Sequence, residues 1–380
     1  MTIRMYAGFF LPIALSFSAT CAESHAISEA QKFEIFDITR MVVHPETQDV
    51  MLIQKGTESL TRLHFDGKKY QEKLLYFPWK DHLSKVKISD YHWEKNATIL
   101  AVNQDHTLAV GYKYVPKDGA CVLYSYKIVG DQLQWAGFNL DIPFTDPEME
   151  KNFRPSAMEF IAGSPFLTYS NHWHQTTVVK IDKEGVWSKN YQIMEGRGSR
   201  DMTKVVLGTL SIPNYAEGED DRLYVWSGIG RELQILESVH KKSEEFSTRN
   251  DRRFEVGHED SVITAFAAQH ATTRGSHDFI VGTSRQEALL YLDQDPMQEP
   301  TPSISLPLNE SATTVTAAAF APDQKTMAVG TADNHLYVFR KGEGDPELIH
   351  HWVAPAAIQT ISFANGDVLI ATATALFILR

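Results

Sequence analysis

The chain has 380 residues, of which 43% are hydrophobic and 22% charged, so it has an ordinary globular composition with enough apolar residues to bury a core. Its formal net charge of −12 argues against binding to the phosphate backbone of a nucleic acid, because such binding needs clustered Lys and Arg. We therefore expect no nucleic-acid partner.

Residues 1–26 are predicted to be a cleaved signal peptide. Arg4 supplies the positive start, the run Met5–Ala19 carries no charge, and small residues that could flank a cleavage site follow it. The run contains Pro12 and is shorter than the roughly 20 residues that span a bilayer, so we expect no stable membrane span. The protein is then periplasmic or secreted. A retained anchor and a lipoprotein modified at Cys21 are the alternatives.

Residues 27–380 are predicted to be one domain of repeated strand units. Cys121 is its only cysteine, so no internal disulfide is expected. Seven units of about 50 residues fill this length, with six or eight as alternatives. They cover Thr39–Pro78, Val86–Asp141, Phe153–Met194 and Met202–Val239, and the last three start at Val262, Val315 and Ile358. The charged, aperiodic run Lys241–Arg253 is predicted to be an exposed loop.

The sixth unit shows the repeat most clearly. It contains three runs of apolar, β-branched and aromatic residues separated by turn residues, which is typical of consecutive antiparallel strands. The runs are Val315–Phe320, Thr326–Val329 and Leu336–Phe339. The tetrapeptide Ala328–Thr331 (AVGT) matches Ile280–Thr283 (IVGT). Phe320 matches Phe363 at a spacing within the roughly 40 to 50 residues on which propeller blades repeat.

The two ends of the chain predict how the units are closed. Gln31–Ile38 is a candidate strand with no earlier strand to pair with, whereas the last unit ends at Arg380 after only three strands. We therefore expect the N-terminal strand to complete the C-terminal unit. Such pairing closes the units into a ring and removes exposed sheet edges.

The fifth unit resembles a WD40 repeat. In that family a Gly-His pair precedes the innermost strand and a Trp-Asp pair closes the third strand. Here Gly257-His258 precedes the strand at Val262, and Leu292-Asp293 stands in place of Trp-Asp. The resemblance implies an all-β fold with a single β-propeller. The count of repeat units gives this propeller seven four-stranded blades. Because most of the family is non-catalytic, the resemblance also implies a platform for protein interaction.

The resemblance further implies a hydrogen bond from the histidine of the Gly-His pair to an aspartate in the turn between the second and third strands. Asp278 is predicted to precede the second strand, and the turn Ser284–Glu287 has no Asp. We therefore expect this network to be incomplete, with His258 as a buried structural residue.

No catalytic, cofactor-binding or metal-binding residue is assigned, because no Gly-x-Ser-x-Gly, phosphate-loop, His-Glu-x-x-His or Cys-x-x-Cys motif occurs. His172 and His174 would share one face of a strand, as a metal site requires, but no third ligand is fixed beside them. The acidic run Glu217–Asp221 could supply oxygen ligands for calcium, but it lacks the ordered Asp-x-Asp-x-Asp-Gly pattern. We expect both groups to be exposed loop residues and expect no cofactor.

The sequence His350-His351-Trp352 places two histidines side by side. Neighbouring residues of a strand point to opposite faces, so these imidazoles cannot readily share one ion. A packed Trp352 with polar neighbours is the preferred interpretation.

The leading functional hypothesis is a protein-interaction platform, because loops held on a rigid scaffold present a shaped surface at little ordering cost. The expected contact loops are Asn171–Gln175, Ile212–Asp221 and Lys241–Arg253. The residues proposed to touch a partner are His172, Trp173, His174, Tyr215, Glu219, Asp220 and Arg252.

The main rival hypothesis is an enzyme or a ligand or metal binder that uses the central channel, so enzymatic activity is left open. It predicts carboxylates and histidines at the start of several innermost strands. The sequence has mainly small or apolar residues there, at Val262-Ile263, Val315-Thr316 and Ile358-Gln359. An envelope assembly factor is a third hypothesis. A monomer is favoured.

Overall fold

The fold is taken from a computed structural model of the chain. It describes residues 27–57, 59–75, 98–115, 120–143, 155–171, 176–194, 205–212, 221–240, 246–270, 276–294, 304–309, 313–342 and 344–380. All regular elements in these ranges are β-strands. Among these residues no helix is long and apolar enough to cross a membrane.

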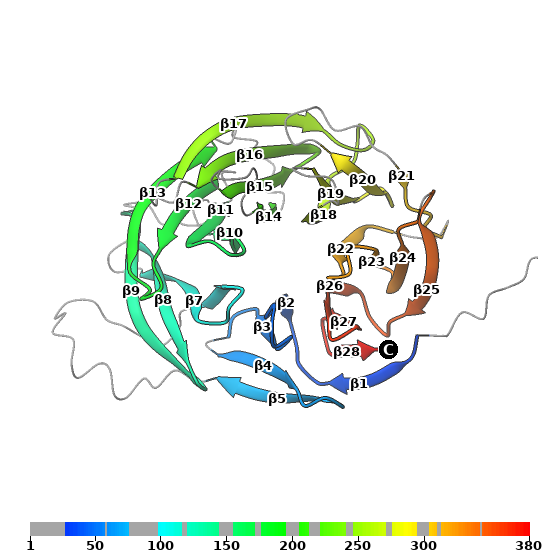
Figure 1. The fold of residues 1–380 in the computed structure, drawn as a ribbon, viewed down its shortest axis with the longest axis horizontal. Helices are drawn as coiled ribbons and strands as arrows, with labels where there is room; N and C mark the ends of the chain where they lie inside the picture. Colours follow the sequence, from blue (N-terminus) through cyan, green and yellow to red (C-terminus); the bar gives the residue numbers. More distant parts are fainter. Residues whose placement is uncertain are drawn as a thin grey trace, which may run out of the picture.

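The described strands form seven four-stranded antiparallel sheets, which stand as blades around a central opening (Figure 1). The prediction of a seven-bladed propeller is confirmed. Blade 1 has β2 (Ile38–Val43), β3 (Val50–Gln54), β4 (Leu60–Phe65) and β5 (Tyr70–Leu75). Blade 2 has β6 (Thr98–Val102), β7 (Leu108–Val115), β8 (Ala120–Val129) and β9 (Gln132–Pro143). Blade 3 has β10 (Pro155–Phe160), β11 (Phe166–Asn171), β12 (Thr176–Ile181) and β13 (Trp187–Met194).

The remaining blades repeat this order from the inside outwards, except that the outermost strand of blade 7 comes from the N-terminus. Blade 4 has β14 (Val206–Ile212), β15 (Asp221–Ile229), β16 (Glu232–His240) and β17 (Phe246–Glu255). Blade 5 has β18 (Ile263–His270), β19 (His277–Thr283), β20 (Ala288–Gln294) and β21 (Ile304–Ser305). Blade 6 has β22 (Val315–Phe320), β23 (Thr326–Thr331), β24 (His335–Arg340) and β25 (Glu347–Val353). Blade 7 has β26 (Ile358–Ala364), β27 (Asp367–Thr372), β28 (Leu376–Leu379) and β1 (Glu29–Phe33).

The ring is closed by the pairing of β1 with β28, as the sequence predicted (Figure 1). Lys32 lies opposite Phe377 in an antiparallel register. Beyond the strands, the amide of Ser28 donates to the carbonyl of Arg380 at 2.9 Å, and the amide of Arg380 donates back to Ser28 at 3.1 Å. The strand is shorter than the expected Gln31–Ile38, because it ends at Phe33 and Ile38 already begins β2.

Blade 1 is attached to this closure by Tyr70 at the start of its outermost strand. Its amide donates to the side-chain oxygen of Gln31 at 2.6 Å, and the Gln31 amide group donates back to the Tyr70 carbonyl at 3.1 Å. The Tyr70 hydroxyl donates to the carbonyl of Ala364 at 2.9 Å. One buried tyrosine therefore joins β1, blade 7 and blade 1.

The glycine in the repeated AVGT and IVGT segments allows neighbouring blades to approach closely. A Cβ atom at Gly282 would lie 2.4 Å from Cγ1 of Val315, and one at Gly330 would lie 2.6 Å from Cγ2 of Ile358. Val315 and Ile358 begin the innermost strands of the following blades. In blades 5 and 6 the glycine of the second strand thus leaves the space that the next blade fills.

The expectation that Lys241–Arg253 is a loop is wrong for residues 246–253, while residues 241–245 lie outside the described residues. Residues 246–253 belong to β17, which pairs with β16 and places Arg252 opposite Ile235. The strand is the outermost one of blade 4, and charged residues are common on such edges because they oppose pairing with other chains. A charged sequence there does not exclude a strand.

Replacing Gly330 with Ala is expected to destabilise the ring, because the new methyl group overlaps Ile358 and β26 must shift. We expect the free energy of unfolding in urea to fall by about 1 to 3 kcal/mol. Gly344→Ala is the control, since no heavy atom lies within 4 Å of a Cβ there. Equal stability of the two variants would contradict the close-packing role of Gly330.

His106, in the turn between β6 and β7, predicts a loss of stability in acid. Burial lowers its pKa to about 4, although its Nε2–H donates to the Val42 carbonyl of blade 1 at 2.9 Å. The unfolded chain binds this proton near pH 6.5, so stability falls as the pH drops from about 6.5 towards 4. His106→Gln keeps a hydrogen-bond donor but cannot ionise. When the pH is lowered from about 7.5 to about 4.5, its free energy of unfolding in urea should therefore fall by about 2 to 3 kcal/mol less than that of the wild-type protein. An unchanged pH dependence would refute this assignment.

Candidate functional site

The wall of the central channel is built from one bulged residue in each of six innermost strands. At these positions the register with the second strand shifts by one residue, whereas β14 pairs with β15 without a shift. The bulged residues, which all line the channel, are Thr39, Leu100, Ser156, Thr264, Thr316 and Gln359. A bulge turns a side chain away from the regular alternation, and in these six blades it turns one side chain towards the axis.

Four of the bulged residues carry hydroxyl groups, and each hydroxyl repairs the ladder that its bulge interrupts. The acceptor is always the carbonyl of the second-strand residue that pairs with the residue after the bulge. The hydrogen bonds run from Thr39 to Ile53 (3.1 Å), Ser156 to Ser170 (3.1 Å), Thr264 to Gly282 (3.2 Å) and Thr316 to Gly330 (3.2 Å). These hydroxyl groups therefore have a structural role.

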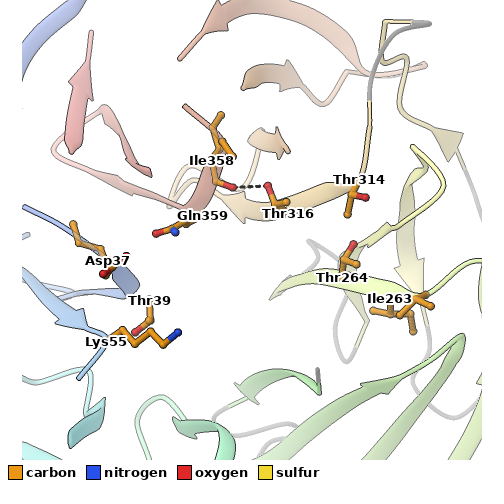
Figure 2. Close-up of a pocket in the computed structure, with 12 residues that line it drawn as sticks. Asp37, Thr39, Lys55, Ile263, Thr264, Thr314, Thr316, Ile358 and Gln359 are labelled. Carbon is orange, nitrogen blue, oxygen red and sulfur yellow. Dashed lines mark hydrogen bonds between the residues drawn. The ribbon is translucent and has the colours of Figure 1, made fainter. Parts of the chain in front are cut away.

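Two of these threonines also join neighbouring blades. The Thr264 hydroxyl lies within hydrogen-bonding distance of the Val315 carbonyl, and the Thr316 hydroxyl is placed in the same way at the Ile358 carbonyl (Figure 2). Each hydroxyl hydrogen is thus shared between its own blade and the next one. The prediction that the innermost strands begin with mainly small or apolar residues missed this polar wall, because it did not foresee the bulges.

A second set of polar interactions connects innermost strands further along the channel. The Arg40 guanidinium of β2 donates to the Met158 carbonyl of β10 at 2.8 Å and forms an ion pair with Glu159. The other oxygen of Glu159 accepts from the Thr209 hydroxyl of β14 at 3.0 Å. Arg40 and Glu159 therefore neutralise each other while they connect blades 1, 3 and 4.

One end of the channel opens into a cavity of about 530 Å³ between blades 5, 6, 7 and 1 (Figure 2). We call this opening the channel mouth. Asp37, Lys55 and Gln359 lie at its edge, each with an exposed side chain. No side-chain hydrogen bond or ion pair joins these three to another residue in the described ranges, in contrast to the threonines. The mouth is thus the part of the channel where polar groups are available to a ligand.

Two backbone hydrogen bonds fix the mouth to the ring closure. Asp37 lies between β1 and β2 in the left-handed conformation, with φ of 52°, and its amide donates to the Ala373 carbonyl at 3.3 Å. The Lys55 amide donates to the Asp37 carbonyl at 2.9 Å. The same connection that closes the ring therefore positions two of the three available groups.

Of the residues predicted to contact a partner, only Arg252 lies in the described ranges. It is exposed on β17, away from the innermost strands. The other six, namely His172, Trp173, His174, Tyr215, Glu219 and Asp220, lie outside the described residues. The strands that border the three expected loop segments end on different faces of the ring. β11 is the second strand of blade 3 and ends on the same face as β3, the second strand of blade 1, which leads into the channel mouth at Lys55. β14 and β16, the first and third strands of blade 4, end on the opposite face.

The expectation for Asp278 is wrong. It lies within β19, is 1% exposed, and forms an ion pair with Lys341 of blade 6 at 2.8 Å. Its position was misjudged because a charged residue at a buried strand position looks like part of a turn. The role of Asp278 is to join blades 5 and 6.

His258 is exposed, not buried as expected. Its backbone amide donates to Oε2 of Glu287 at 3.3 Å, and the Thr283 hydroxyl donates to the same oxygen at 3.0 Å. The turn without an Asp therefore uses Glu287 to hold this corner of blade 5, through the backbone of the Gly-His pair.

The bulge repair predicts opposite effects for two kinds of substitution. Thr264→Val and Thr316→Val remove the hydroxyl but keep the shape, so each should lower the free energy of unfolding by about 1 kcal/mol. Gln359→Thr supplies a hydroxyl to a bulge that lacks one and should raise stability by up to about 1 kcal/mol. Urea unfolding measures all three. Unchanged stability in both valine variants would show that the hydroxyl groups do not support the ring.

Comparisons with known proteins agree with this architecture. No protein-family model matches the chain, and no curated protein matches it in sequence. Among solved structures, the one titled "Structure of U3-55K" aligns with 93% of this chain and 98% of its own, with a TM-score of 0.57 and 12% identity. The "Crystal structure of RRP9 WD40 repeats" aligns with 94% of this chain and 98% of its own, with a TM-score of 0.55 and 13% identity. The chain therefore has the fold of a seven-bladed WD40-like propeller.

Proposed function

We propose that this propeller is an exported scaffold that holds a protein partner at the channel mouth. The contrast between the channel wall and its mouth carries the proposal. Wall hydroxyls at Thr39, Thr264 and Thr316 are engaged with backbone carbonyls, while Asp37 and Lys55 present charged groups to the opening. A partner loop can use these groups without disturbing the bonds that hold the blades together.

The size and setting of the mouth support a protein ligand. A cavity of about 530 Å³ is large enough to admit side chains of a partner loop, and the surrounding blade ends offer further contact area. Two neighbouring groups of opposite charge, Asp37 and Lys55, suit a polypeptide that presents both signs. Because the mouth belongs to a closed ring, little ordering is needed on binding.

A second candidate function is binding of a small molecule in the same cavity, since its volume lies in the range of roughly 300 to 1,000 Å³ that is typical of ligand pockets. In that case a protein partner is not required, and the purified protein alone should bind the ligand. The two candidates share a site and differ in what occupies it.

Cross-linking tests the proposed partner site. A photoreactive residue at Lys55 or Gln359 is expected to cross-link to a distinct protein in the native compartment, because both side chains lie at the mouth. Lys183, exposed in the turn between β12 and β13 on the opposite face, is the matched control position. Lys55→Glu should reduce capture of the same partner by about tenfold, as expected for a lost charge pair. Equal cross-linking at Lys183, or none at the mouth, would refute the proposal.

The proposed export rests on the charged start at Arg4 and the uncharged run Met5–Ala19. Sequencing the N-terminus of the protein purified from the host compartment tests it. We expect a chain that starts within a few residues of Ala26, recovered outside the cytoplasm. A cytoplasmic chain that retains Met1 would contradict export without affecting the proposed partner site.

A further inference from the structure

His335 of β24 and His351 of β25 form an unusually close pair on blade 6. Nδ1 of His335 lies 2.7 Å from Nε2 of His351, the rings are within 9° of parallel, and their centroids are 4.9 Å apart. For two imidazoles with this N···N distance, the centroid separation is close to its maximum, which is reached when both nitrogens lie on the line that joins the two centroids. Since the ring planes are also nearly parallel, the rings lie edge to edge in one plane. Their nitrogens therefore face each other, and one must carry a hydrogen while the other accepts it.

Asp333 favours one arrangement of the hydrogens. Its Oδ2 lies 3.7 Å from Nε2 of His335, so a hydrogen on that nitrogen faces the carboxylate. Nδ1 of His335 is then the acceptor, and Nε2–H of His351 is the donor. Because Asp333 is hydrogen-bonded to Thr313 at 3.0 Å, its position is fixed.

Among the described residues, few other ionisable groups face the pair. The Tyr337 ring lies 6.0 Å from His335 and 5.0 Å from His351, measured between centroids. The adjoining connection from blade 5, Leu306–Asn309, carries no titratable side chain. His350 lies on the other face of β25, because it pairs with Val338 while His351 pairs with Tyr337. Within the described part of the chain, Asp333 is thus the acidic side chain that lies beside the pair.

The pair tolerates one added proton but not two. With one added proton, a cationic imidazole still donates to a neutral one, and such charge-assisted hydrogen bonds are stronger than neutral ones. A second proton removes the acceptor and brings two cations into contact. In agreement, the pKa of His351 is lowered from its ordinary value, first by burial and then by the charge of His335.

We propose that the His335–His351 pair is a proton-operated latch that holds β25 on blade 6. While one imidazole is neutral, the pair fastens β25 to β24. When both are protonated, the fastening is lost and β25 opens from the blade more often. β25 suits this role because it is outermost, because its register is interrupted between Val338 and Phe339, and because it exposes Leu348 and Val353.

Hydrogen exchange of the intact protein tests the latch. Because its pKa is lowered, His351 stays neutral down to a lower pH in the latched state than in an opened strand. The latched state is therefore favoured above about pH 6.5 and loses this advantage as the pH falls. After correction for intrinsic exchange rates, the opening equilibrium constant of the β25 amides should be larger at about pH 5 than at about pH 7.5, by a factor of up to about thirty. Blade 1 amides in the same sample serve as the reference for global unfolding.

Two substitutions and one control complete the test. His335→Asn and His351→Gln each keep a polar atom near the original nitrogen but cannot ionise, so the pH-dependent opening of β25 should disappear. His64→Asn removes an exposed histidine of blade 1 that contacts Asp49 at 2.9 Å, and it should leave the opening unchanged. Protection of β25 that is independent of pH, or that changes equally in all variants, would overturn the proposal.

A direct titration covers the case in which a variant does not fold. In the wild-type protein, NMR of the imidazole protons should show two coupled ionisations, with the second below the ordinary histidine pKa. Two independent ionisations at the ordinary value would equally overturn the latch.

Discussion

The structure depends on the pairing of the first strand with the last. Most contacts of a propeller blade are with its two neighbours, so the stability of the ring depends on every junction, including the last one. β1 supplies the fourth strand of blade 7, and Arg380 fixes the end of the chain with two bonds to Asp367, at 2.8 and 3.2 Å. A third bond from Arg380 reaches the Lys68 carbonyl of blade 1 at 3.1 Å. The first and last strands of the described chain are thereby joined to the same two blades.

This junction also determines what the channel mouth contains. The chain leaves β1, turns at Asp37 and enters β2, the innermost strand of blade 1. The turn is held to blade 7 at Ala373 and to Lys55 of blade 1 by backbone hydrogen bonds. Ring closure and the proposed binding surface therefore share the same residues. A partner that binds at the mouth would stabilise the closed ring, because it binds only the assembled site.

Crowding at the axis explains two other features of the inner strands. Glycine in the second strand, as at Gly282 and Gly330, makes room for the next blade. A bulge in the innermost strand turns a side chain into the channel, and a threonine or serine there satisfies the carbonyl that the bulge leaves unpaired. Both features recur in several blades and, as at Gly282 and Thr264, each can contact the next blade. The recurring glycine is visible in the sequence, whereas the bulge changes only the pairing and leaves no clear pattern.

Most of the fold could be predicted from the sequence, since strand length, turn residues and the AVGT repeat act locally. The closure was predictable because Gln31–Ile38 had no partner and the last unit lacked a strand. β17 was missed because its charges lie on an outer edge. The pairs Arg40 with Glu159 and His335 with His351 were also missed, because blade order and register bring them together. Only the second pair had a visible sign, the His350-His351 dipeptide on a predicted strand.

A disulfide trap across the closure tests the central claim most directly. Ser28 and Arg380 exchange two backbone hydrogen bonds, and residues paired in this way lie at a Cα separation of about 5.5 Å, which suits a disulfide. In the chain carrying Ser28→Cys and Arg380→Cys, with the native cysteines replaced by serine, mild oxidation should yield a circular monomer that migrates faster on a non-reducing denaturing gel. A chain that stays linear under these conditions, or that cross-links only between molecules, would contradict a ring closed by its own two ends.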